Sequence, residues 1–173
     1  PAYTGSFFGL LNPFGLLCGV LSLAMIVFHG ANYLVLRTEG ALQARAEKVG
    51  AAAGFLSAVL FILGGIWTYF GIDGYIATAG LDPAGPAVPL AKTVEVQAGA
   101  WFANFSACPV LWIVPLLGIL GTLGGAAMTK KGAAGKTILC SSVALLGIIL
   151  TPLVSMFPFV MPSSAMPNAG LTI

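Results

Sequence analysis

Long runs of residues without a formal charge constrain this chain more than any other feature. The first run covers residues 14–36, which are 23 residues without an Asp, Glu, Lys or Arg. An α-helix rises about 1.5 Å per residue, and the hydrocarbon core of a bilayer is about 30 Å thick. A helix of this length therefore crosses the core, and the run predicts a membrane-spanning segment.

Three further charge-free runs follow, at residues 49–72, about 105–127 and about 137–159. The composition agrees with four spans, because 58% of the residues are hydrophobic, only 7% are charged and the mean hydropathy is +1.01. A water-soluble domain has about 25% charged residues. We therefore expect an all-α fold, a polytopic membrane helix bundle. Its four transmembrane helices would form a single transmembrane domain over residues 1–173, as part of a larger bundle.

The segments between the spans carry nearly all of the charge. Residues 73–99 are predicted to form a long loop with a short helical turn at 92–97. Six of the seven basic residues lie in the two short turns after the first and third spans: Arg37, Arg45, Lys48, Lys130, Lys131 and Lys136. Basic loops stay in the cytoplasm, so these turns should be cytoplasmic, and the 73–99 loop and both ends outside. A net charge of +2 predicts no nucleic-acid partner.

Small and polar residues share one side of the first predicted helix, at about 100° per residue. Larger apolar residues, including Phe28 and Val35, fall mostly on the other side, which we expect to face lipid. The small and polar side consists of Gly15, Cys18, Gly19, Ser22, Met25, His29, Asn32 and Tyr33. Glycines spaced four residues apart let helices approach closely, and the chain has such pairs at Gly15/Gly19, Gly50/Gly54 and Gly121/Gly125.

Prolines mark the later spans. Pro109 is expected to begin the third span, since proline suits the first turn of a helix. Pro115 and Pro152 lie within the third and fourth spans and are expected to kink them, because each removes a backbone donor. The sequence thus predicts tilted, partly kinked helices.

His29 is the only histidine and lies within the first span. An ionisable group inside a membrane suggests a function, and Asn32 lies one turn away. Three interpretations stay open: a structural, hydrogen-bonded histidine, which we favour; a contact of His29 and Asn32 to a quinone headgroup or a proton; and a metal ligand. The methionines show no ligand spacing and are interpreted as packing residues. No catalytic residue and no metal site are predicted.

Several sequence blocks, in chain order, resemble subunit II of cytochrome bd quinol oxidases. They are LNPFGLLCGV at 11–20, HGANY at 29–33, RTEG at 37–40, YFGIDGY at 69–75, GAWFANF at 99–105, PVLW at 109–112 and MFPFVMPSS at 156–164. The blocks cover nearly the whole chain. It looks like the middle and C-terminal part of that subunit, so upstream helices and one further helix downstream are expected.

The resemblance implies a bacterial terminal oxidase of the respiratory chain in the cytoplasmic (inner) membrane. Such an oxidase couples the oxidation of ubiquinol or menaquinol to the reduction of dioxygen to water and generates a proton gradient. The resemblance places its haem b558, haem b595 and haem d in subunit I, the heterodimer partner that this chain would scaffold. It also implies a structural quinone in subunit II and a small accessory membrane subunit, and it transfers no haem ligand to this stretch.

Two other functions compete with the oxidase subunit. Glycine- and proline-interrupted helices with a polar stripe at mid-membrane suit a secondary transporter or channel bundle. The spans, however, offer almost no charged or coordinating residues for a transported ion. A structural membrane subunit of another respiratory complex is the other alternative.

Overall fold

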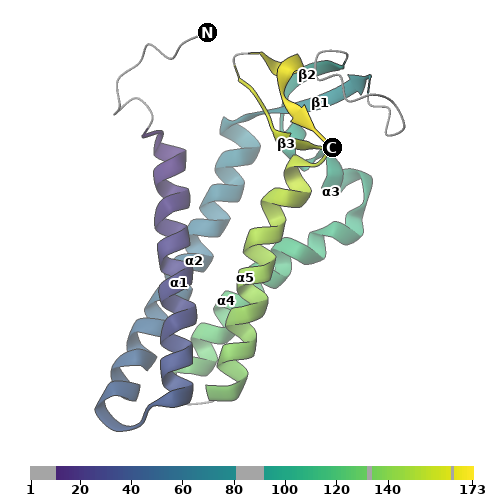
Figure 1. The fold of residues 1–173 in the computed structure, drawn as a ribbon. Coiled ribbons are helices and arrows are strands. Elements are labelled where there is room, and N and C mark those ends of the chain that lie inside the picture. The colour runs from purple at the N-terminus through teal and green to yellow at the C-terminus, as the bar shows by residue number, and fades with distance from the viewer. Residues whose placement is uncertain (1–10, 81–91, 132–133, 165) are drawn as a thin grey trace. The chain divides into compact units, whose positions relative to one another are not determined.

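Long apolar helices dominate the structure, a computed structural model that describes residues 11–80, 92–131, 134–164 and 166–173 (Figure 1). Within these residues, four helices are long and apolar enough to cross a membrane. They are α1 (Pro13–Arg37), α2 (Gly40–Gly71), a third formed by the 3-10 helix η3 (Pro109–Trp112) with α4 (Ile113–Thr129), and α5 (Ala134–Met156). The predicted all-α, polytopic membrane bundle is confirmed.

The largest difference from the predicted spans is at the start of α2. Arg45, Glu47 and Lys48, predicted in a polar turn, are helical because α2 already begins at Gly40. The turn consists of Thr38 and Glu39 alone. The Thr38 hydroxyl donates to the Leu34 carbonyl at 2.7 Å and so caps the end of α1. Gly40 then adopts φ +68°, a left-handed conformation that glycine accepts at little cost.

The prolines lie at different depths in their helices. Pro109 begins η3, as predicted. Pro115 lies in the first turn of α4, where backbone N–H groups have no carbonyl partner within the helix. The proline therefore removes no hydrogen bond from the interior of α4. Pro152 lies inside α5. A kink at Pro152 stays a prediction.

Two compact units divide the chain. The helical unit comprises Pro1–Gly64 and Pro115–Ile148, and the hairpin unit comprises Gly65–Val114 and Ile149–Ile173. Helices α2, α4 and α5 contribute residues to both units. Each unit has its own packing.

Close backbone approach joins α4 and α5 in the helical unit. A Cβ atom placed on Gly121 would lie 2.8 Å from the Ala144 nitrogen and 2.9 Å from its Cα. One turn earlier, a Cβ on Gly118 would lie 3.2 Å from the Ile148 nitrogen. The predicted close packing at Gly121 is confirmed, since a larger residue there would meet backbone rather than a movable side chain.

Phe28 fills the space among α1, α2 and α4. Its side chain is fully buried, and a Cβ atom on Gly54 would lie 2.7 Å from its Cε2 atom. A Cβ on Gly125 would lie 2.6 Å from its Cζ atom. The predicted packing of Gly54 and Gly125 against neighbouring helices is confirmed. The prediction that Phe28 faces lipid is wrong, because glycines on two neighbouring helices leave a hollow that only a large side chain fills.

The remainder of α1 corrects the predicted faces further. Val35, predicted toward lipid, is 2% exposed, whereas Gly15 and Gly19 are exposed and a Cβ on either would meet no described atom within 4 Å. Met25 and Asn32 are buried, as expected of the polar side. The buried stripe of α1 therefore consists of Ala24, Met25, Phe28, Ala31, Asn32 and Val35. The surfaces of α2, α4 and α5 determine which residues of α1 are buried, and the size of the α1 residues does not.

The hairpin unit contains an antiparallel pair of strands where a loop was predicted. β1 (Asp73–Ala79) pairs with β2 (Thr93–Ala98), with Asp73 opposite Ala98 and Ile76 opposite Glu95. The helical turn predicted at 92–97 is wrong, because Thr93, Val94 and Val96 favour a strand when a partner strand is present. Residues 81–91 of the predicted loop lie outside the described residues.

Side-chain hydrogen bonds connect the rest of the hairpin unit. Asn104, in the short helix α3 (Ala103–Ala107), donates its amide to the carbonyls of Val154 at 2.8 Å and Phe157 at 2.6 Å. These carbonyls lie at the end of α5, where a helix has no N–H partner to offer. The chain continues through the 3-10 helix η2 (Ala100–Phe102), and β3 (Phe159–Met161) pairs with β4 (Leu171–Thr172). The 3-10 helix η4 (Pro167–Ala169) precedes β4.

Substitution of Gly121 by valine should destabilise the full-length protein by about 1–3 kcal/mol or more, since overpacking here displaces backbone. Gly124→Val is the matched control in the same helix, because a Cβ on Gly124 meets no described atom within 4 Å. Unfolding of the purified protein in detergent would measure both. Equal stability of the two variants would contradict the α4–α5 packing.

Candidate functional site

The single histidine contacts α5 in the helical unit. His29 Nδ1 lies 2.9 Å from the Ser141 hydroxyl oxygen, and the Ser141 side chain is fully buried. That hydroxyl donates its proton to the Ile138 carbonyl at 2.9 Å. Because serine has one hydroxyl proton, we assign the Nδ1 nitrogen as the donor to Ser141. The histidine, which sequence reasoning singled out, is therefore hydrogen-bonded to a neighbouring helix.

Asn32, one turn further along α1, contacts α4 instead. The Thr129 hydroxyl oxygen lies 2.9 Å from Asn32 Oδ1 and 2.7 Å from the Gly125 carbonyl oxygen, so its single proton is shared between these two acceptors. Both side chains are fully buried. The two polar residues of α1 thus bond to two different helices.

The amide nitrogen of Asn32 is the one buried side-chain polar atom without a partner in the described part of the chain. The residue faces α2 at Gly50, where an added Cβ would lie 3.1 Å from Asn32 Oδ1. An unpaired buried donor costs about 1–3 kcal/mol relative to a satisfied one. This nitrogen is therefore the one position in the contact where a hydrogen-bond acceptor would be stabilising.

The chemistry available to this arrangement is limited. The recorded partner of the imidazole is the Ser141 hydroxyl, and a proton relay needs several titratable groups in sequence. The described residues contain no group of three or more His, Cys, Asp and Glu side chains placed to hold a metal ion. The arrangement is suited to joining helices.

Sequence reasoning missed the partners of these residues. The partners are Ser141 of α5 and Thr129 of α4, and both are fully buried. Thr122 is also fully buried on α4. The spacing of the two threonines carried a usable signal, since Thr122 and Thr129 lie seven residues apart and hence on one helical face with Gly118 and Gly125. Small hydroxyl residues at helix contacts are frequent in membrane bundles.

Comparison with known proteins assigns the chain to a family. The family model described as cytochrome bd terminal oxidase subunit II matches residues 1–173. The chain belongs to this family. It is 46% identical over 171 residues to the cytochrome bd-I ubiquinol oxidase subunit 2 of Escherichia coli K12, a match that covers 99% of this chain and 45% of the relative.

A second relative gives the same result. The probable cytochrome oxidase subunit 2 of Haemophilus influenzae is 47% identical over 169 residues, which cover 98% of this chain and 44% of that protein. The chain therefore spans less than half the length of the curated relatives that it matches. The resemblance seen in the sequence blocks is confirmed.

Thr129→Val should destabilise the full-length protein by about 1 kcal/mol more than Thr122→Val, because it also leaves Asn32 Oδ1 without a donor. Thr122 is an appropriate control, since it is equally buried and donates only to the carbonyls of its own helix, Gly118 and Ile119. Denaturant titration in detergent would measure the difference. A larger effect at Thr122 would contradict the bond between α1 and α4.

Proposed function

We propose that this chain is the middle to C-terminal part of subunit II of a cytochrome bd-type terminal oxidase. The complex couples quinol oxidation to the reduction of dioxygen to water and generates a proton gradient. The observation that carries the proposal is 46–47% identity along nearly the whole chain to relatives named as oxidase subunits. Family membership also argues against the transporter, channel and unrelated-complex alternatives.

The role of this stretch is to scaffold the haem-bearing partner, subunit I. The resemblance to subunit II transfers no haem ligand to this stretch, and its one histidine, His29, contacts Ser141 of a neighbouring helix through Nδ1. We therefore assign haem b558, haem b595 and haem d to subunit I. The proposed small accessory subunit and the quinol substrate, ubiquinol or menaquinol, are likewise properties of the whole complex.

We propose a structural role for His29 and Asn32, since each joins α1 to a different helix. The unpaired amide nitrogen of Asn32 is the one observation that favours a quinone contact, because a quinone carbonyl is an acceptor. The quinone content of the purified complex after Asn32→Leu distinguishes these roles. Unchanged quinone supports the structural role, and loss of bound quinone would assign Asn32 to its site.

The proposed location is the bacterial inner membrane, with the basic turns in the cytoplasm and both ends of this stretch outside. The helical unit supports this orientation, because Lys48 near the start of α2 and Lys130 after α4 line the same groove. A basic residue of α2 and one of the turn after α4 therefore lie at the same end of the unit. That grouping is what the positive-inside rule requires.

Absorption spectra of membranes test the proposed function. Membranes in which the full-length subunit is expressed with its partner should show the red band of the chlorin-type haem d. Deletion of the full-length subunit should remove this band together with quinol-dependent oxygen consumption. An intact, well-expressed complex without the band would contradict the oxidase assignment.

His29→Ala should leave the haem spectrum and oxygen consumption unchanged and should lower stability by about 0.5–1.5 kcal/mol, the usual net value of one hydrogen bond. A double-mutant cycle with Ser141→Ala measures the coupling between the two side chains. Positive coupling supports a structural contact. Loss of a haem band in His29→Ala would instead show that His29 serves a cofactor.

A further inference from the structure

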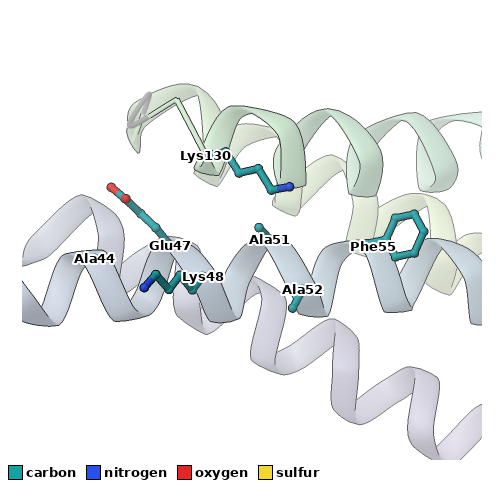
Figure 2. A pocket seen from close by; sticks show the side chains of 7 residues that line it. All are labelled: Ala44, Glu47, Lys48, Ala51, Ala52, Phe55 and Lys130. Atoms are coloured by element: carbon teal, nitrogen blue, oxygen red, sulfur yellow. The ribbon is translucent and has the colours of Figure 1, made fainter.

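A groove of about 570 Å³ lies at the charged end of α2 in the helical unit (Figure 2). Seven residues line it: Ala44, Glu47, Lys48, Ala51, Ala52 and Phe55 of α2, and Lys130 after α4. The α2 residues recur at intervals of three and four, so they form one face of that helix. Figure 2 shows the Lys130 side chain extending from the end of α4 beside this face.

The groove crosses the predicted boundary between water and hydrocarbon. Lys48 is the last charged residue before the charge-free run 49–72, and Lys130 directly follows the end of α4 at Thr129. Both lysines therefore mark the same membrane surface. Phe55 lies seven residues beyond Lys48, which is about 10 Å deeper along the helix. One end of the groove is thus polar, and the other is apolar.

The charged side chains of the groove are not neutralised by one another. In the described residues, no Lys–Glu pair within 4.0 Å joins Glu47 to Lys48 or Lys130. Two ammonium groups and one carboxylate give the polar end a formal charge of +1. Charge complementarity therefore favours an anionic ligand. The two lysine side chains are exposed, so they are free to reach it.

We propose that this groove binds an anionic phospholipid. Lys48 and Lys130 bind the headgroup phosphate, and one acyl chain lies along Ala51, Ala52 and Phe55. Phe55 is 63% exposed in the helical unit, which gives the acyl chain an apolar surface next to the lysines. Basic pockets between transmembrane helices are suited to such headgroups. The inference needs only the membrane-spanning helices and goes beyond the proposed oxidase function.

The test uses the full-length subunit in its complex, reconstituted in phosphatidylcholine vesicles with increasing fractions of photoreactive phosphatidylglycerol. Crosslinking to the α2 peptide, measured by mass spectrometry, gives an apparent affinity. The double variant Lys48→Gln/Lys130→Gln should weaken this affinity about twenty-fivefold, since each lysine at a membrane surface contributes roughly fivefold.

Arg45→Gln/Lys131→Gln is the matched control, because it removes two positive charges from the same end of the unit without changing the groove. Equal losses in the two double variants would overturn the proposal in favour of general surface attraction. Complex yield and the absorption spectrum show whether each variant folds.

Two further measurements separate the ligands that share this chemistry. Ala52→Trp obstructs the apolar part of the groove without changing its charge, and it should weaken crosslinking as well; an unchanged yield would overturn the acyl-chain contact. Inorganic phosphate at millimolar concentration should not displace the probe. Full displacement by phosphate would identify a free-anion site rather than a lipid site, and equal crosslinking of a phosphatidylcholine probe would exclude headgroup selection.

Discussion

The helical unit depends on close packing against glycines, which neighbouring backbone or a bulky side chain contacts directly. In a bilayer, apolar side chains gain little from leaving lipid for a helix interface, so association relies on close packing and hydrogen bonds. Gly121 permits backbone contact between α4 and α5, while Gly54 and Gly125 make the hollow that Phe28 fills. The pattern of glycines therefore determines which face of α1 is buried.

Packing of this kind does not alone determine how far α1 is rotated or shifted, because its opposite face is also apolar. The bonds of His29 to Ser141 and of Asn32 to Thr129 supply that information, since each connects a specific residue of α1 to a different helix. Such bonds contribute about 0.6 kcal/mol each in membrane proteins. Their main effect is therefore on the specificity of packing, which is the structural role that we propose for His29.

The sequence predicted the elements better than their contacts. Charge-free runs identify spanning helices because burial of an unpaired charge in hydrocarbon is costly, and all four helices formed. The side of a helix that faces lipid is harder to predict, because Phe28 and Leu16 are equally compatible with lipid by composition. Only the neighbouring glycines distinguish them. Strands β1 and β2 were missed for a related reason, since each is stabilised by pairing with the other rather than by its own residues alone.

Because α2 begins early, at Gly40, charged residues near its start lie on the same helix face as the apolar residues of the groove. In a turn, Glu47 and Lys48 would have no fixed relation to Ala51 and Phe55. In a continuous helix, spacings of three and four residues place all of them on one face, beside Lys130. The charged residues from which we predict the orientation are thereby held next to the first apolar turns of the span. The sequence marks the membrane boundary only by its composition. The folded helix places polar and apolar residues at that boundary on one continuous face.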